Sequence, residues 1–320
     1  MGEHLEGKSV VITGGGRGIG RAIALAVAGE GAGVVIADYG GHVERNQAGT
    51  SEAADAVVKE IEAAGGQAVA AAVDVSTMQG GRDATHAAMD AFGRLDGLVC
   101  CAGITNLKYL WELDEQEWDD VIGVHLKGHF SCVQAAAKVM IPKGSGSIIT
   151  IASGSWTGMP NTIAYSTAKA GILGFTWSTA YGLGRYGIRA NCMVPSAATR
   201  MSDTIYGTTG KLSNRFGDTM RSDLAEGTYR DPSQVAPLAV HLLSDASSEI
   251  NGQVFRAQGY EISRMMPMTF AFNRTITSVG PWDVDAIAER LPAELGPDLQ
   301  PPPVPWPEPD QTPGLPKEDD

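Results

Sequence analysis

The chain has 320 residues, and its 43% hydrophobic and 19% charged residues are ordinary for a globular protein with a sizeable core. A net charge of −13 argues against a nucleic-acid partner or an anionic membrane surface, and no apolar run reaches the roughly 18 residues of a membrane span. The start of the chain lacks the features of a signal peptide and the four cysteines lack the spacing of a zinc site, so we expect a cytoplasmic protein without a metal.

Apolar, strand-like runs alternate with amphipathic helical stretches along most of the chain. The expected strands are residues 9–13, 33–37, 68–75, 95–103, 147–153, 188–194 and 253–259. The expected helices are residues 18–28, 51–64, 82–92, a long one from about 114, 164–182 and 231–245, with Ser51, Asp114 and Asp231 as N-caps. Repeated strand–helix units predict an α/β fold, a doubly wound, Rossmann-like parallel sheet with helices on both faces.

The series of strand–helix units ends near residue 265, so we expect one domain over residues 1–265 and a C-terminal extension over residues 266–320. The extension contains a helix candidate at residues 283–291 and becomes rich in proline from Pro297. Such a tail is typically extended and solvated. The alternative is a tail that folds over an active site of its own or of a neighbouring subunit, because Trp306 gives it a large side chain to bury.

The first expected strand runs directly into TGGGRGIG, residues 13–20, which fits the pattern T-G-x-x-x-G-x-G. Gly14 permits a turn that a side chain would block, and Gly18 lets the backbone approach a diphosphate. Gly20 lets the following helix pack closely on the strand, and the start of that helix offers free N–H groups to phosphate. The loop therefore predicts a dinucleotide site.

Asp38 stands at the tip of the second expected strand, before the long polar stretch DYGGHVERNQAG. An acidic residue at this place is suited to hydrogen-bond the ribose hydroxyls of NAD, and its charge would repel the extra phosphate of NADP. The sequence therefore predicts NAD as the cofactor. The alternative is that Asp38 only caps the strand.

Tyr165 and Lys169 lie four residues apart in the expected helix 164–182, so their side chains share one face. An ammonium beside a phenol lowers the pKa of the phenol, which can then exchange a proton with an alcohol or a ketone. Ser153 ends the preceding strand, where its hydroxyl can bind the substrate oxygen. This set predicts acid–base chemistry on an alcohol.

Together these motifs resemble the short-chain dehydrogenase/reductase family over roughly residues 5–260. The resemblance implies hydride transfer between the alcohol carbon and a nicotinamide, with Tyr165 moving the proton, Ser153 orienting the oxygen and Lys169 also binding the nicotinamide ribose. It further implies a set of cofactor-binding residues: Thr13, Gly14, Arg17, Gly18, Ile19, Gly20, Asp38, Tyr39, Asp74, Val75, Cys101, Ala102, Gly103, Tyr165, Lys169, Pro195, Ser196, Ala198 and Thr199.

The sequence departs from the family pattern at several places. Cys101 stands where Asn is more usual, and residues 194–201 lack the usual Pro-Gly. The serine spacing is one residue short, so Ser155 is an alternative to Ser153. His125 stands where the family commonly has an Asn that helps to hold a proton-relaying water. A His can also bond a water and titrates near neutrality, but the alternative is a His that only packs between helices.

These departures are similar to one branch, the (3R)-hydroxyacyl-CoA dehydrogenase domains of multifunctional β-oxidation enzymes with related bacterial 17β-hydroxysteroid dehydrogenases. We therefore expect an NAD-dependent dehydrogenase of a secondary alcohol, either a steroid or a 3-hydroxyacyl-CoA, that assembles as a homotetramer. A small xenobiotic or terpenoid alcohol is the alternative substrate. A catalytically silent NAD-binding regulator is the alternative from another class, although such a protein has no physical reason to keep Ser153, Tyr165 and Lys169 together.

Residues 196–230 are expected to cover the substrate. Lys211, Arg215 and Arg221 in this segment would meet the phosphates of a CoA substrate, or they are solvated surface charges. The sequence does not decide between these interpretations.

Overall fold

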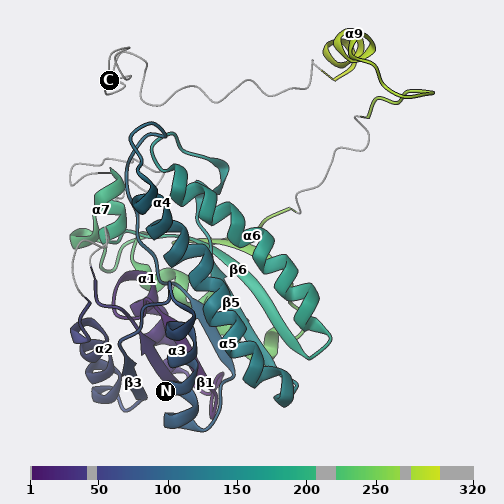
Figure 1. Cartoon of the computed structure of the whole chain (residues 1–320). Coiled ribbons are helices and arrows are strands. Elements are labelled where there is room, and N and C mark those ends of the chain that lie inside the picture. The colour runs from purple at the N-terminus through teal and green to yellow at the C-terminus, as the bar shows by residue number, and fades with distance from the viewer. Residues whose placement is uncertain (1, 42–48, 207–220, 267–274, 296–320) are drawn as a thin grey trace. The chain divides into compact units, whose positions relative to one another are not determined.

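The computed structural model describes residues 2–41, 49–206, 221–266 and 275–295. The contacts divide the chain into two compact units, Met1–Met265 and Met266–Asp320. Within the described residues, the first unit holds an eight-stranded sheet in the order β3-β2-β1-β4-β5-β6-β7-β8 (Figure 1). This order has two halves that wind outward from β1 and β4, and it confirms the expected doubly wound α/β fold.

Seven strands are parallel, and one short strand is not. The parallel strands are β1 (Ser9–Thr13), β2 (Gly33–Ala37), β3 (Gln67–Ala71), β4 (Gly97–Cys100), β5 (Gly146–Ile151), β6 (Ile188–Ser196) and β7 (Val254–Gln258). The eighth strand, β8 (Glu261–Arg264), pairs with β7 in antiparallel register and is not predicted by the sequence. It contains one apolar residue, so it carries no strand-like pattern.

Helices cover both faces of the sheet, and their bounds are as follows: α1 (Gly18–Gly29), α2 (Glu52–Ala63), α3 (Met78–Phe92), α4 (Glu115–Ile122), α5 (Gly128–Lys143), α6 (Ile163–Gly184), α7 (Arg200–Tyr206) and α8 (Ala236–Leu243). In β1, Val10 and Ile12 join one core with α1, α2 and α8, whereas Val11 joins a second core with α3, α5 and α6. The alternation follows from the two-residue period of a strand. Burial on both faces explains why the strand sequences are apolar throughout.

The predicted helix starts are partly right. Asp114 caps α4 and forms a capping box with Glu117, as the sequence predicts. Ser51 stands at the N-cap of α2 but makes no capping hydrogen bond. The helix expected from residue 82 begins earlier, because the Thr77 hydroxyl accepts a hydrogen bond from the Gly80 N–H at 2.9 Å and caps a first turn that contains two glycines. The low helix propensity of glycine hides this turn in the sequence.

The long helix expected from residue 114 is interrupted. After α4 the chain forms a π-helix over Gly123–Lys127, and α5 begins at Gly128. A π-helical turn holds one residue more than an α-helical turn and is frequent at functional sites. His125 lies in this widened turn, which the sequence GVHLK does not distinguish from ordinary helix.

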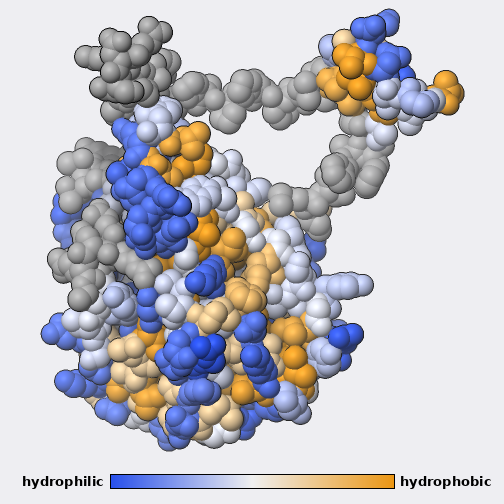
Figure 2. All heavy atoms as spheres, in the orientation of Figure 1, coloured by the Kyte–Doolittle hydropathy of each residue, from blue (hydrophilic) through white to orange (hydrophobic). Residues whose placement is uncertain are grey.

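The surface over α4 is strongly acidic. It forms a hydrophilic area on the face shown in Figure 2, and its acidic residues are Glu115, Glu117, Asp119 and Asp120. All four cysteines are free. Among the helices that the structure describes, none combines the length and the hydropathy needed to cross a membrane.

The second unit contains the helix α9 (Val284–Glu294), which confirms the helix expected near residues 283–291. The Asp283 carboxylate caps it by accepting a hydrogen bond from the Ala286 N–H at 2.7 Å. The proline-rich tail from Pro297, with both of its interpretations, lies outside the described residues.

Candidate active site

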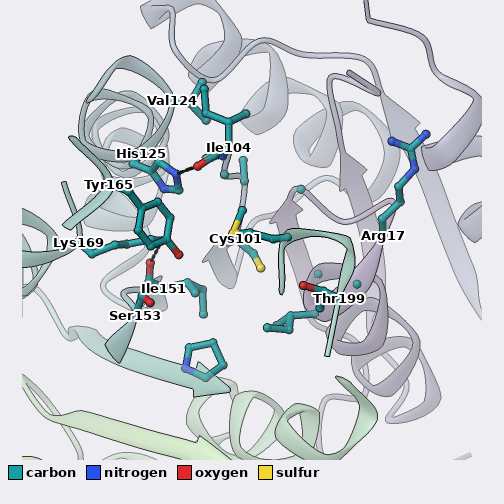
Figure 3. Close-up of a pocket in the computed structure, with 18 of the residues that line it drawn as sticks. Arg17, Cys101, Ile104, Val124, His125, Ile151, Ser153, Tyr165, Lys169 and Thr199 are labelled. Carbon is teal, nitrogen blue, oxygen red and sulfur yellow. Dashed lines mark hydrogen bonds between the residues drawn. The ribbon is translucent and has the colours of Figure 1, made fainter. Parts of the chain in front are cut away.

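A cavity of about 490 Å³ lies at the carboxyl ends of the parallel strands. Its walls come from the segments that follow β1 to β6, which is where ligands bind in a doubly wound sheet. Figure 3 shows Ser153, Tyr165 and Lys169 on one side of this cavity, with Arg17 and Thr199 on the other. The volume suits a small molecule or part of a cofactor.

Most residues predicted for the site line this cavity. They are Gly14, Arg17, Gly18, Ile19, Gly20, Asp38, Tyr39, Asp74, Val75, Cys101, Ala102, Gly103, His125, Ser153, Ser155, Tyr165, Lys169, Pro195, Ser196 and Thr199. Two predicted residues, Thr13 and Ala198, lie behind the wall. The Thr13 hydroxyl accepts hydrogen bonds from the Cys101 and Ala102 N–H groups at 3.0 and 3.1 Å, so it fixes the segment after β4. Ala198 is buried, and its N–H donates to the Arg230 carbonyl at 2.8 Å.

The glycine loop packs so closely against its surroundings that there is no room for a side chain at its glycines. Gly14 and Gly18 have φ values of 65° and 53°, in the left-handed region that favours glycine. A Cβ on Gly14 would lie 2.7 Å from the Ala102 Cα, and a Cβ on Gly20 would lie 2.1 Å from the Gly14 carbonyl oxygen. The loop therefore needs glycine at these positions for its own packing, and the start of α1 faces the cavity.

Asp38 ties two backbone segments together at the end of β2. One carboxylate oxygen accepts a hydrogen bond from the Gly16 N–H at 2.8 Å, and the other accepts from the Gly40 N–H at 2.7 Å. Nearby, the Arg17 guanidinium donates to the Gly41 carbonyl at 3.2 Å. Asp38 thus does more than cap a strand, because it joins the glycine loop to the start of the polar stretch. Residues 42–48 of that stretch lie outside the described residues.

Tyr165 and Lys169 are buried one turn apart on α6 and reach the cavity side by side. The Lys169 ammonium lies 5.4 Å from the centre of the Tyr165 ring and donates a hydrogen bond to the Ile151 carbonyl at 2.7 Å. Burial lowers the pKa of Lys169 to about 8, against a smaller opposite effect of the Cys101 and Cys192 thiols. Lys169 therefore remains mostly protonated at pH 7 although it is enclosed.

Both candidate serines line the cavity just beyond β5. Ser153 is the N-cap of a short 3-10 turn, Gly154–Thr157, and its hydroxyl accepts a hydrogen bond from the Ser155 N–H at 3.2 Å. The Ser155 hydroxyl lies 3.4 Å from the Met159 sulfur. The Ser153 and Ser155 hydroxyl oxygens are 3.4 Å apart, so the structure brings both candidates to one place.

His125 is buried between the cavity wall and Tyr165. Its Nε2 lies 2.7 Å from the Ile104 carbonyl oxygen and 3.1 Å from the Ile104 N–H nitrogen, and its ring meets the Tyr165 ring edge-on with centroids 5.0 Å apart (Figure 3). Among the described residues, its buried Nδ1 has no hydrogen-bond partner. Burial first, and then the charge of Lys169, hold the pKa of His125 well below 6.5. The expectation that His125 titrates near neutrality is therefore wrong, because its ring is enclosed beside a cation.

The structure adds residues that the sequence reasoning does not single out. Arg200 lines the cavity at the start of α7, where burial lowers its pKa, Arg17 lowers it further and Asp38 opposes the shift. Apolar residues also contribute to the wall: Ile104, Val124, Met159, Val194 and Met201. Their positions in the chain could have indicated them, because each follows or faces the end of a strand that carries a predicted site residue.

Part of the expected substrate cover cannot be placed. Lys211 and Arg215 lie outside the described residues. Arg221 forms a surface ion pair with Asp223 at 2.5 Å. Its interpretation as a phosphate ligand therefore gains no support, because a surface partner already engages the guanidinium.

The cavity fits a dinucleotide in its chemistry. The glycine loop presents backbone rather than side chains to it, Asp38 offers a carboxylate and Arg17 a guanidinium, and Tyr165 and Lys169 stand at its other end. Backbone N–H groups at a helix start suit phosphate, and a carboxylate suits ribose hydroxyls. The residues that line the cavity therefore fit the chemistry of a nicotinamide dinucleotide.

Comparison with known proteins agrees with this chemistry. The sequence profile described as short chain dehydrogenase matches residues 8–208. A 3-oxoacyl-(acyl-carrier-protein) reductase of Staphylococcus aureus (strain N315) is 36% identical over 254 residues, which are 79% of this chain and 97% of that protein. A hydroxyacyl-CoA dehydrogenase of Mycobacterium tuberculosis is 34% identical over 293 residues, 88% of this chain and 87% of that protein. A crystal structure of a short chain dehydrogenase from Mycobacterium avium has a TM-score of 0.77 at 35% identity and covers 94% of this chain and 98% of its own.

Proposed function

The chain belongs to the short-chain dehydrogenase family, whose members are oxidoreductases that act on CH–OH groups, and we propose that it is an NAD-dependent dehydrogenase of 3-hydroxyacyl thioesters. The observation that carries the proposal is the convergence of Ser153, Tyr165 and Lys169 on the cavity that the glycine loop also borders. The names of the relatives from Staphylococcus aureus and Mycobacterium tuberculosis support an acyl thioester as the substrate class.

NAD is the proposed cofactor because Asp38 places a fixed negative charge at the end of β2. Its carboxylate is oriented by the Gly16 and Gly40 N–H groups, and each oxygen has a further lone pair for a ribose hydroxyl. The extra phosphate of NADP at the same place would be repelled by the Asp38 carboxylate. Arg17 and Arg200 lie near Asp38 and partly offset the repulsion, so discrimination against NADP should be moderate rather than absolute.

Tyr165 is the proposed general acid and base. In the oxidation direction, the Ser153 hydroxyl orients the alcohol oxygen and Tyr165 accepts its proton, while a bound nicotinamide would supply the acceptor for the hydride. Lys169 stabilises the negative charge that develops on the tyrosine oxygen, since its own charge is held by the Ile151 carbonyl close to the ring. In the reduction direction, Tyr165 donates the proton to the ketone.

His125 is proposed to hold a water rather than to exchange protons by titration. Its neutral ring leaves Nδ1 as the buried nitrogen without a protein partner among the described residues. A water that bonds Nδ1 would satisfy this atom and stand close to Tyr165, which touches the same ring. Packing against Tyr165 and Ile104 is the second role of the ring, and the two roles are compatible.

A homotetramer in the cytoplasm is proposed as the working form. Helices α5 and α6 expose large side chains that a monomer would leave in water, with Phe130 44% and Tyr181 93% exposed. Sedimentation at micromolar concentration tests the assembly, and a monomer alone would contradict it. The cytoplasmic location is supported by four free thiols.

The proposal is tested with a panel of alcohols and both cofactors, followed at the absorbance of reduced nicotinamide. We expect the highest kcat/KM with a (3R)-hydroxyacyl-CoA and NAD, and the (3S) isomer and the acyl-CoA without a hydroxyl serve as matched controls. A preference for a steroid or a small terpenoid alcohol would contradict the substrate class. Cofactor binding without turnover of any alcohol would instead favour the NAD-binding regulator.

A further inference from the structure

His129 is a second buried histidine behind the catalytic groups, and the proposed reaction does not use it directly. It lies on α5, four residues after His125, with 2% of its surface exposed. Its Nδ1 is 2.5 Å from the His125 carbonyl oxygen, and its Nε2 is 3.3 Å from the Ile151 backbone nitrogen. One imidazole thus joins the widened turn that carries His125 to the end of β5.

The two backbone partners determine the protonation of this ring. A carbonyl oxygen can only accept a hydrogen bond, so Nδ1 must carry the proton. A backbone N–H can only donate, so Nε2 must be the bare nitrogen. A doubly protonated ring would lose the Ile151 bond, and burial, the largest cause, together with the charge of Lys169 lowers the pKa of His129 to about 3. The ring is therefore neutral and in one tautomer at all physiological pH values.

Two short routes link His129 to the catalytic groups, one through the Ile151 backbone and one through the His125 residue. Ile151 donates its backbone N–H to His129. Its carbonyl oxygen accepts a hydrogen bond from the Lys169 ammonium at 2.7 Å. The His125 residue whose carbonyl binds His129 places its ring against Tyr165 and Ile104. The positive charge of Lys169 lowers the pKa of both histidine rings.

We propose that His129 is a positioning residue that fixes the Ile151 backbone and the widened turn together, and so holds Lys169 and His125 in register with Tyr165. The proposal rests on the proposed dehydrogenase function for its catalytic consequence. The hydrogen-bond pattern of a π-helical turn differs from that of the regular helix. His129 gives the His125 carbonyl in this turn a side-chain donor with Nδ1, and it secures the strand with Nε2.

The test separates the two bonds by substitution. In His129→Asn the side-chain amide nitrogen can replace Nδ1 as donor, but nothing reaches Ile151. In His129→Gln the amide oxygen can replace Nε2 as acceptor, but the bond to the His125 carbonyl is lost. His129→Phe keeps the ring volume and removes both bonds. The matched control is Thr176→Val, which removes a buried hydrogen bond of 2.6 Å between Thr176 of α6 and Thr150 of β5, outside the residues that line the cavity.

We expect kcat to fall about 10-fold or more in His129→Phe, because a small displacement of a catalytic group is costly. The KM for the alcohol should change less than about threefold, and the Asn and Gln variants should lie between Phe and the parent. Thr176→Val should lower the melting temperature with kcat unchanged. A kcat of His129→Phe within twofold of the parent, or a loss no larger than that of Thr176→Val, would overturn the proposal.

A second measurement does not depend on turnover. Nitrogen NMR of the imidazoles in the full-length parent protein, which has six histidines, is assigned with the His129→Gln and His125→Asn variants. His129 should show a protonated Nδ1 and a bare Nε2, unchanged from pH 8 to pH 5. Titration near pH 6.5, or the opposite tautomer, would overturn the bridging role. If the parent turns over no alcohol, the proposed function fails, and this measurement alone decides whether His129 bridges the two peptides.

Discussion

The two ends of the cavity are built on opposite principles. At the cofactor end, the wall is backbone: Gly14, Gly18 and Gly20 leave no room for a side chain. At the catalytic end, the wall is made of buried polar side chains, Tyr165, Lys169 and His125. The first end should therefore fail when atoms are added, and the second when atoms are removed. The difference also predicts which function is lost, because binding depends on the first end and chemistry on the second.

The largest effect is expected from removing the buried charge in Lys169→Met. Turnover should fall by about 10²–10⁴-fold, the range for loss of an acid–base group, because the tyrosine loses its stabilising cation. The affinity for NAD should also fall, since the same ammonium serves the ribose. Steady-state kinetics and a binding titration measure the two effects. Turnover within tenfold of the parent would contradict the account.

The same variant should be more stable than the parent at neutral pH, because methionine fills the site without a desolvated charge. The folded-state pKa of Lys169, about 8, lies below the ordinary lysine value of 10.5, so the parent gains stability as pH rises from 8 to 10.5. The advantage of Lys169→Met in melting temperature should be greatest below pH 8 and should shrink over that interval. An advantage that is constant with pH would mean that the charge of Lys169 is not the cause.

An added methyl group tests the other end of the cavity. In Gly20→Ala the new carbon would lie 2.1 Å from the Gly14 carbonyl oxygen, so the glycine loop must open. Overpacking of this kind costs about 1–3 kcal/mol, equivalent to about 5- to 150-fold in NAD affinity if the loop bears the strain on binding. Fluorescence titration with NAD measures it. Gly29→Ala is the matched control, because it lies in the same helix with nothing within 4 Å of the added carbon, and equal affinities of the two variants would contradict the prediction.

A smaller effect is expected from a change at Asp38, which contributes both to NAD binding and to the selectivity for NAD over NADP. Asp38→Ala removes the carboxylate but leaves the glycines in place, so the affinity for NAD should fall about tenfold, as for a lost charged hydrogen bond. The affinity for NADP should rise, because the repulsion is gone while Arg17 and Arg200 remain. The ratio of kcat/KM for the two cofactors is the measurement. A parent that already prefers NADP would contradict the role of Asp38.

The sequence predicts the cofactor end better than the catalytic end. The first strand, the glycine loop and Asp38 can be predicted from short-range patterns, because they lie within about 30 residues of one another in the chain. Tyr165 and Lys169 are also local, because they stand one turn apart. Tyr165 and Lys169 meet the glycine loop at one cavity because the strands are parallel and end at the same edge of the sheet. The predicted alternation of strands and helices already implies this parallel sheet.

The parts that sequence reasoning missed depend on long-range contacts or on one extra residue in a turn. His129 looks like an ordinary helix residue until the π-helix places it under the His125 carbonyl and beside Ile151. The neutral state of His125 depends on burial beside Lys169, which is 44 positions away in the chain. Arg200 lies within residues 194–201, but nothing in that stretch indicates that its guanidinium lines the cavity. Each of these properties arises from packing between elements rather than within one.

Tyr165→Phe tests the separation of the two ends most directly, because it deletes one oxygen and keeps the ring that packs against His125. NAD affinity by fluorescence titration and turnover of the best alcohol are measured on the same preparation. We predict an affinity within about twofold of the parent and a turnover reduced by at least about 10²–10⁴-fold. A variant that still turns over at a rate near that of the parent, or one that loses NAD binding in proportion to its activity, would contradict the account.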